Sequence, residues 1–366
     1  MLCIVFGTRP EAVKLYPLTE ALRQRNVPFV LCSTGQHKEL LTDTLRVLGM
    51  TPDVSLPAIP HGATLSDITQ IVAQRMHSVF LCMKPDTVVV HGDTTSAFAA
   101  ALSAFYLRIP VAHVEAGLRT YRTDAPYPEE FNRRAIDVAA KTCFAPTAKA
   151  AEHLLNEGKR PTEVYITGNT VTDVLRKTVT EDFTHPLLTL TKNARYILLT
   201  IHRRENLDGG VIRIFRAVRR LSEAVPDVHI VCPLHVNPVI GRAAAEIFSF
   251  CDRIHLLPPL DVISFHNFLS RCCFVLTDSG GVQEEAAFLG KPTLVARDVT
   301  EREEGIEAGV LHLVGTEEEN VYRACLRLLT DESTYRKAAT KTDVFGDGHA
   351  GERIADILLQ KETERA

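Results

Sequence analysis

The sequence predicts an α/β protein with two doubly wound parallel sheets, one in each half of the chain, facing each other across a cleft. Three observations support this fold class. Short apolar runs alternate with helical patterns along almost all of the 366 residues. Most strand-like runs end in a polar cluster, where open α/β sheets bind ligands. Each half also has a strand that ends in Asp followed by small residues, at Asp93–Ser96 and Asp278–Gly281.

In the first half, the opening strand is followed at once by a helix, because Gly7-Thr8-Arg9 forms a turn and Pro10 suits a first helical turn. Apolar residues at positions 12, 15, 18 and 22 share one face of that helix. The strands expected in this half are residues 2–6, 28–32, 86–91, 110–113, 142–145 and 163–166. Helices are expected over residues 38–48, 65–83 and 97–106, with a further one opening at Glu129.

The second half repeats the alternation of strand and helix. Its expected strands are residues 196–200, 228–232, 253–256, 273–276 and 293–296. Its expected helices are residues 211–224, 317–329 and 351–360, with another beginning directly after Gly281 and ending at Gly290. We place the boundary between the halves near Gly168-Asn169.

Composition excludes several functional classes. The 41 basic and 45 acidic residues are nearly balanced, which argues against a nucleic-acid-binding protein. The only apolar run at the N-terminus, residues 2–6, is too short for a signal peptide, and no run reaches membrane-spanning length. The nine cysteines are odd in number and lack CxxC spacing, so they are expected to be reduced in a cytoplasmic protein.

The stretch Thr277–Glu285 predicts a nucleotide-diphosphate site. A buried strand stops at Asp278-Ser279-Gly280-Gly281, and a helix starts there. Two glycines let a ligand approach the backbone, and the N-terminus of a helix favours an anion. Glu284 and Glu285 lie one turn into the helix, within reach of a ribose hydroxyl. A tight turn followed by a solvated Glu pair is the alternative interpretation.

The polar clusters at the other strand ends divide by charge. Cationic side chains with paired N–H donors suit a diphosphate. Carboxylates with shifted pKa values suit proton transfer. The pattern therefore predicts a nucleotide whose diphosphate lies against the second half of the chain and whose sugar faces the first half. The cationic or potentially cationic group contains Arg9, Lys14, His202, Arg203, Arg204 and His235. The carboxylate group contains Asp93, Glu115, Glu129 and Glu130.

Structural explanations remain open for several of these residues. Asp93 could cap a helix, and Glu115 could belong to a structural ion pair. Arg9 could pair with Glu11, and His202 could lie on a solvated edge. His91 and His113, inside apolar runs, are expected to be satisfied core histidines. Metal-site, G-x-G-x-x-G and Walker spacings are missing.

Taken together, these clusters resemble the bacterial non-hydrolysing UDP-N-acetylglucosamine 2-epimerases from Cys3 to about Ile357. The matching motifs are Gly7–Lys14, Gly92–Thr95, His113–Thr120, Pro128–Arg133, Thr200–Asn206, Asp278–Glu285 and Arg297–Arg302. The resemblance implies two Rossmann-like domains of glycosyltransferase-B-like type, here residues 1–168 and 169–346, with a C-terminal helix in residues 347–366 that packs back on the first domain. It also implies a cytoplasmic homodimer that needs no cofactor or metal and supplies a mannosamine sugar for surface polysaccharide.

The resemblance implies a role for each matching site residue. Catalytic roles fall on Asp93, Glu115, Glu129 and His202. Substrate-binding roles fall on Arg9, Lys14, Arg133, Ser279, Gly280, Gly281 and Glu285. A second, regulatory site matches at Gln36, Arg204 and His235, but Glu39 and Ile71 stand where Gln and Arg are usual, so substrate activation is an open question. A modified UDP-sugar, such as a 3-acetamido uronic acid derivative, is an alternative substrate. A glycosyltransferase on the same fold is an alternative enzyme.

Overall fold

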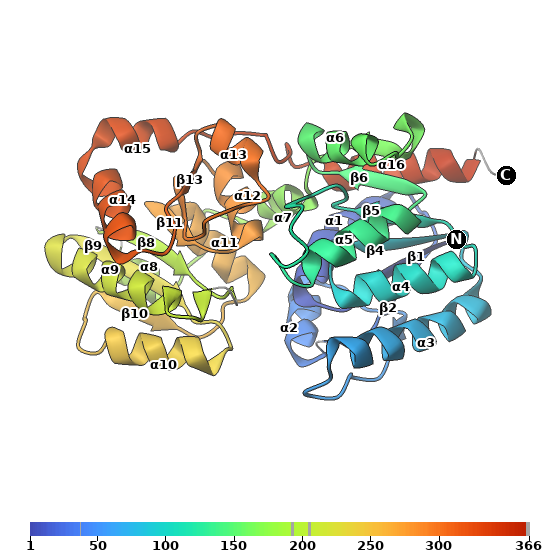
Figure 1. Cartoon of the computed structure of the whole chain (residues 1–366), viewed down its shortest axis with the longest axis horizontal. Helices are drawn as coiled ribbons and strands as arrows, with labels where there is room; N and C mark the ends of the chain where they lie inside the picture. Colours follow the sequence, from blue (N-terminus) through green and yellow to red (C-terminus); the bar gives the residue numbers. More distant parts are fainter. Residues whose placement is uncertain (37, 192–193, 204–205, 364–366) are drawn as a thin grey trace. The chain divides into compact units, whose positions relative to one another are not determined.

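The computed structural model describes residues 1–36, 38–191, 194–203 and 206–363, which form two compact units. The first unit contains residues 1–174 and 346–366, and the second contains residues 175–345. The division falls between Val174 and Leu175, inside a helix that starts just after the boundary expected from sequence. Figure 1 shows the elements of each unit.

The first unit is built on a parallel sheet in the order β3-β2-β1-β4-β5-β6-β7. Its central strand β4 is fully buried, because apolar residues occupy both faces. The strands are β1 (Leu2–Phe6), β2 (Phe29–Ser33), β3 (Val54–Ser55), β4 (Thr87–His91), β5 (Val111–Val114), β6 (Thr142–Ala145) and β7 (Val164–Ile166).

Helices of the first unit cover the sheet and place its polar turns. Helix α1 buries Ala12, Leu15, Leu18 and Leu22, as the spacing predicts. The last helix of the chain, α16, packs closely on α1, since a Cβ at Gly351 would lie 2.7 Å from the Pro17 carbonyl carbon. The helices are α1 (Arg9–Gln24), α2 (Lys38–Leu48), α3 (Leu65–Met83), α4 (Thr95–Tyr106), α5 (Glu129–Ala139), α6 (Ala148–Asn156), α7 (Thr170–Thr178, which crosses into the second unit) and α16 (Ala350–Thr363).

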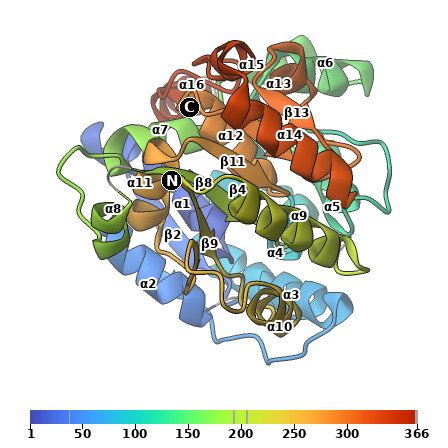
Figure 2. The same ribbon diagram turned by 90° about the vertical axis from the view of Figure 1, so that its left-hand side faces the viewer.

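The second unit has a parallel sheet in the order β10-β9-β8-β11-β12-β13. Helices α9 and α14 lie side by side against it (Figure 2). The strands are β8 (Arg195–Thr200), β9 (Val228–Pro233), β10 (Ile254–Leu257), β11 (Phe274–Thr277), β12 (Thr293–Val295) and β13 (Leu311–Leu313). The helices are α8 (Pro186–Leu190), α9 (Gly210–Ala224), α10 (Pro238–Ile247), α11 (Val262–Arg271), α12 (Gly280–Phe288), α13 (Glu303–Glu307), α14 (Glu318–Thr330) and α15 (Glu332–Ala338).

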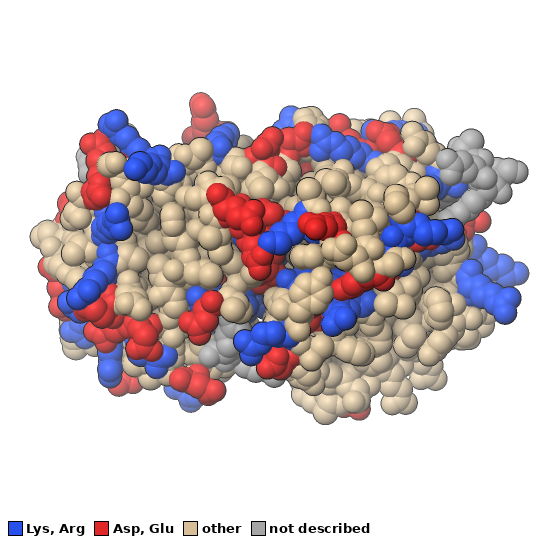
Figure 3. All heavy atoms as spheres, turned by 45° about the horizontal axis from the view of Figure 1, so that its top comes forward, with Lys and Arg blue, Asp and Glu red and all other residues tan. Residues whose placement is uncertain are grey.

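The two α/β sheets confirm the predicted fold class. In both sheets the strand order reverses beside the first strand, the switch point where open α/β sheets bind ligands. Across the described ranges, no helix is both long and apolar enough to cross a bilayer. Acidic and basic side chains are interspersed on the face shown in Figure 3, in keeping with the near-zero net charge.

Candidate active site

Two tight turns at neighbouring strand ends carry the candidate catalytic carboxylates of the first unit. Asp93 follows β4 through Gly92, whose φ is +66°. Glu115 follows β5 and itself has a φ of +67°, a conformation that costs a non-glycine residue free energy and is concentrated at functional sites. The two turns are joined directly, because the Gly92 N–H donates to the Val114 carbonyl at 2.9 Å.

The Glu115 carboxylate is held by residues from two other segments. Its Oε2 accepts from the Lys14 ammonium of α1 and, at 2.7 Å, from Asn169 Nδ2. His91 Nε2 lies 3.7 Å from the same oxygen, is buried and has no hydrogen-bond partner among the described residues. Burial lowers the pKa of His91 to about 4, so the imidazole is neutral at neutral pH. Glu115 is therefore paired with the Lys14 ammonium and lies near the neutral ring of His91.

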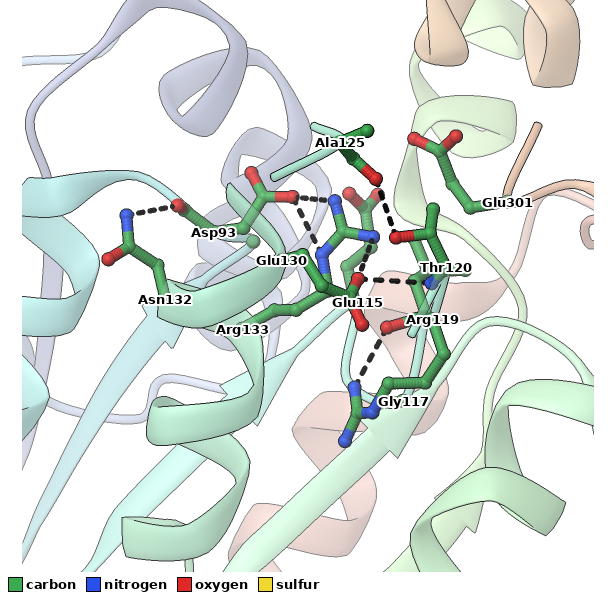
Figure 4. A network of polar contacts seen from close by, with 12 residues as sticks. Asp93, Glu115, Gly117, Arg119, Thr120, Ala125, Glu130, Asn132, Arg133 and Glu301 are labelled. Atoms are coloured by element: carbon green, nitrogen blue, oxygen red, sulfur yellow. Dashed lines mark hydrogen bonds and ion pairs between the residues drawn. The ribbon is translucent and has the colours of Figure 1, made fainter. Parts of the chain in front are cut away.

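Asp93 has a cationic partner of its own, Arg133 of α5 (Figure 4). Arg133 donates to Asp93 Oδ2 through Nη2 and, at 3.1 Å, through Nε. Asn132 fixes the same turn by donating to the Asp93 carbonyl at 2.9 Å. Asp93 is not the helix cap, because the Thr94 side chain caps α4 by accepting from the Ala97 N–H at 3.0 Å. The Asp93 side chain remains 26% exposed, so a ligand can reach it.

The two glutamates that open α5 have different surroundings. Glu130 is buried and accepts from the backbone N–H groups of Thr120 and Tyr121, each at 3.0 Å. Its carboxylate therefore organises the polar loop after β5 (Figure 4). Glu129 is only half-buried and stands at the first position of α5, where the helix dipole stabilises a carboxylate.

The first turn of α1 contains a buried carboxylate that the sequence did not single out. Arg9 opens this helix, and Glu11 accepts from the Gly7 and Thr8 N–H groups at 3.1 and 2.7 Å and from the Thr94 hydroxyl at 3.0 Å. Burial raises the pKa of Glu11 to about 7, although these hydrogen bonds act in the opposite direction. Glu11 therefore ties the turn after β1 to the turn after β4.

This raised pKa predicts a pH dependence of stability that Glu11→Gln removes. Between Glu11's ordinary pKa of 4.5 and its folded pKa of about 7, the folded state keeps a proton that the unfolded state has lost. The free energy of unfolding of the wild type, relative to Glu11→Gln, should therefore fall as pH rises through this window, by up to about 1.4 kcal/mol per pH unit. It should be level above the window. Urea unfolding of both proteins from pH 4 to 8 measures the difference, and a pH-independent difference would contradict the raised pKa.

In the second unit, the glycine turn after β11 opens α12 as the sequence predicts, and its tight packing explains one of the glycines. A Cβ at Gly280 would lie 2.7 Å from Arg302 Nη1. Arg302 cannot move away easily, since it is buried and paired with Glu284 at 2.8 Å and with Glu301. The expectation that Glu284 can reach a ribose is wrong, because its carboxylate is buried and paired with Arg302. Glu285 is partly exposed and lies 3.6 Å from His266.

Asp278 organises the neighbouring loop after β8, a role that the sequence motif does not indicate. Its buried carboxylate accepts from the His202 N–H at 3.0 Å, the Arg203 N–H at 2.9 Å and Asn206 Nδ2 at 2.8 Å. His202 Nδ1 also lies 3.1 Å from Asp278 Oδ1. Burial alone would raise the pKa of Asp278, but these contacts, led by His202, lower it overall. His202 is thus anchored rather than a solvated edge residue.

The residues assigned to a second site lie in both units. Gln36 accepts from the Ser96 hydroxyl in the first unit. His235 is exposed in the second unit, and its ring stacks on His202 with centroids 5.5 Å apart. Arg204 and the side chain of Glu39 lie outside the described residues, and Ile71 packs against the core of the first unit. The His202–His235 contact places a catalytic candidate beside a regulatory one.

This chain matches several known UDP-N-acetylglucosamine 2-epimerases. The family model described as UDP-N-acetylglucosamine 2-epimerase matches residues 20–359. The chain is 47% identical to the UDP-N-acetylglucosamine 2-epimerase of Bacillus subtilis over 97% of this chain and 94% of that protein. Among solved structures, the S. aureus MnaA–UDP co-structure matches with a TM-score of 0.95 and 43% identity, covering 99% of this chain and 96% of that one.

A second solved structure is the Neisseria meningitidis UDP-GlcNAc 2-epimerase bound to UDP-GlcNAc. It matches with a TM-score of 0.94 and 38% identity, covering 98% of this chain and 99% of that one. The paired α/β units and these matches define an isomerase with a glycosyltransferase-B-like fold. The chain belongs to the UDP-N-acetylglucosamine 2-epimerase family. The resemblance inferred from its motifs is thereby confirmed.

Proposed function

We propose that this protein interconverts UDP-N-acetylglucosamine and UDP-N-acetylmannosamine by inverting C2 of the sugar. One observation carries the proposal: Asp93 and Glu115 stand at adjacent strand ends, each held by a cation from a helix, Arg133 and Lys14. Two carboxylates positioned in this way can act as general base and general acid. The names of the relatives support the choice of substrate, since one is bound to UDP-GlcNAc.

The chemistry explains why carboxylates alone are not sufficient. The C2 proton is not adjacent to a carbonyl, so it becomes acidic only as the C1–O bond breaks and positive charge develops at C1. Loss of the C2 proton with departure of UDP gives a 2-acetamidoglucal. UDP then adds back at C1 while a proton is returned to the opposite face of C2. Cations must stabilise the leaving diphosphate, and each such contact contributes about 3 kcal/mol.

The proposed roles follow from this sequence of steps. Proton transfer at C2 is assigned to Asp93, Glu115 and Glu129. Arg133 holds Asp93 and Lys14 holds Glu115, and both cations are also assigned to substrate binding. The diphosphate is assigned to Arg9 and His202 and to the turn of Ser279, Gly280 and Gly281, and the ribose to Glu285. Gln36, Arg204 and His235 remain proposed members of a second site.

Deuterium incorporation tests this mechanism. When the protein is incubated with UDP-N-acetylglucosamine in heavy water, deuterium is expected at C2 of both epimers, because the proton lost in elimination exchanges with solvent. NMR and mass spectrometry measure the label. Turnover that retains the original hydrogen would contradict the mechanism. No turnover without an added sugar acceptor would favour a transferase, and faster exchange with a 3-acetamido uronic acid derivative would favour the modified substrate.

The remaining assignments come from the family resemblance. We propose a cytoplasmic homodimer that uses no bound nicotinamide or metal and supplies activated mannosamine for surface polysaccharide. Several large apolar side chains on helices α3, α4 and α5 are exposed and agree with an interface between copies of the chain. They are Leu81, Phe105, Tyr106, Phe131 and Val138.

A further inference from the structure

A buried histidine–aspartate pair links the segments that carry the proposed catalytic carboxylates. His113, on β5, is fully buried, and its Nδ1 lies 2.6 Å from Oδ1 of Asp137 on α5. The other ring nitrogen, Nε2, donates to the Gly92 carbonyl at 2.7 Å. His113 is a satisfied core histidine, as expected from its place in an apolar run, because both of its ring nitrogens have partners.

The His113–Asp137 pair is hydrogen-bonded to the backbone of the two turns that carry Asp93 and Glu115. The carbonyl of Gly92 belongs to the same peptide unit as the N–H of Asp93, so the bond from His113 fixes the plane from which Asp93 projects. On the other side, Oδ2 of Asp137 accepts from the Gly117 N–H at 3.2 Å, two residues beyond Glu115. Gly117 cannot be replaced by a larger residue without a backbone shift, because a Cβ there would lie 2.1 Å from the Ala150 carbonyl oxygen.

Asp137 also connects these turns to the helix that bears Glu129 and Arg133. All three residues lie on α5, and Asp137 is two turns into it. Its Oδ2 is 2.8 Å from Nη2 of Arg119, a buried cation that Glu157 holds with two further hydrogen bonds at 2.8 and 2.9 Å. Burial alone would raise the pKa of Asp137, but His113 and Arg119 lower it overall, so the carboxylate is ionised.

We propose that His113 and Asp137 are positioning residues of the epimerase: they set the relative placement of the Asp93 turn, the Glu115 turn and helix α5. This proposal rests on the proposed function, because it is catalysis at C2 that needs this placement. Neither residue carries a proton to or from the substrate. Their effect comes through the two backbone groups that they hold, the Gly92 carbonyl and the Gly117 N–H.

Hydrogen-bond geometry gives this proposal a distinctive test in two replacements of Asp137. An Asn side chain can turn its oxygen to the Gly117 N–H and Arg119 and its amide nitrogen to His113 Nδ1. His113 Nδ1 then accepts from the amide while Nε2 still donates to the Gly92 carbonyl, so the placement survives without the Asp137 charge. Asp137→Asn is therefore expected to keep kcat within about threefold of wild type.

Asp137→Ala removes all of these bonds and is expected to lower kcat about 100-fold with KM nearly unchanged, since a misplacement of about 1 Å at a reacting group costs this much. His113→Gln, whose single amide cannot serve both partners, is expected to lower kcat at least tenfold. Rates are measured as C2 deuterium exchange per folded molecule, with the folded fraction taken from circular dichroism. If Asp137→Ala does not fold, the kcat values of His113→Gln and Asp137→Asn are compared instead, and a loss in the first variant but not in the second supports the positioning role.

Tyr196→Phe is the matched control for loss of a buried hydrogen bond. The Tyr196 hydroxyl donates to the Phe268 carbonyl at 2.6 Å, near the amino end of β8 and away from the polar turns. It should lose stability and keep its kcat. Equal rates for Asp137→Ala and wild type would overturn the positioning role, as would equal losses in the Asn and Ala variants. Failure of the wild type to exchange C2 would instead overturn the proposed function.

Discussion

Replacing Glu115 by Gln is expected to abolish most of the epimerase activity while leaving the fold and UDP binding in place. A Gln side chain can keep the contacts that Glu115 makes, because its oxygen can accept from both Lys14 and Asn169. It cannot take up the C2 proton. A positioned general acid–base group contributes about 10²–10⁴-fold, so kcat should fall by about 10³-fold.

The measurements for this variant separate chemistry from binding. C2 deuterium exchange should fall with kcat, whereas UDP affinity by calorimetry should change less than threefold, because the diphosphate is assigned to Arg9, His202 and the glycine turn rather than to Glu115. Asp356→Asn is the matched control: it also converts an ion-paired carboxylate of the first unit, bonded to Arg25 at 2.7 Å, to an amide. Wild-type exchange in Glu115→Gln would remove Glu115 from the mechanism.

The elements of the fold could be predicted from sequence because their signals are local. Apolar runs and glycine or proline breaks placed β1, α2, α3 and β6 at the bounds the structure gives them. The strand β3 was missed, since two residues give no periodic pattern, and β13 was missed because a histidine interrupts its apolar residues. Helices α10 and α11 were also missed, although Asn237 and Asp261 cap them with backbone hydrogen bonds that a search for N-cap residues could have found.

The partners of the site residues could not be predicted, because they are fixed by sheet order rather than by spacing. Asn169 reaches Glu115 across 54 residues, and Lys14 does so across 101. The same limit applies to Glu284, whose carboxylate is occupied by Arg302. A sequence pattern shows that a carboxylate stands at a strand end. Only the pairing shows whether a ligand can use it.

Asp278 illustrates the reverse case, in which a residue of a recognised motif has a role that its motif does not reveal. It directly follows β11 and holds the loop after β8, and these two strands are neighbours in the sheet although distant in the chain. The Asp278 carboxylate can thus order the loop that carries His202 and Arg203 without occupying the adjacent glycine turn, which is proposed to bind phosphate.

Asp278→Ala is therefore expected to affect both stability and UDP binding. The substitution leaves the N–H groups of His202 and Arg203 without their buried acceptor, which should lower the free energy of unfolding by about 3–5 kcal/mol. His202 is no longer anchored, so UDP affinity should fall at least tenfold, if His202 contacts the diphosphate as proposed. Urea unfolding and calorimetric titration with UDP measure the two effects.

The pH dependence of this effect follows from the lowered pKa of Asp278. A carboxylate whose folded pKa lies below its unfolded value stabilises the protein fully above the unfolded value and loses that contribution as pH falls through the folded one. The stability difference between wild type and Asp278→Ala should hence be constant from about pH 5 upward and shrink only below about pH 4.

Asp261→Ala is the control in the same unit, since Asp261 also accepts backbone N–H groups, at 2.9 and 3.0 Å, but only caps α11. It should cost about 1 kcal/mol and leave UDP affinity unchanged. If both variants weaken UDP binding equally, the loss reflects general destabilisation, and Asp278 does not organise the diphosphate site.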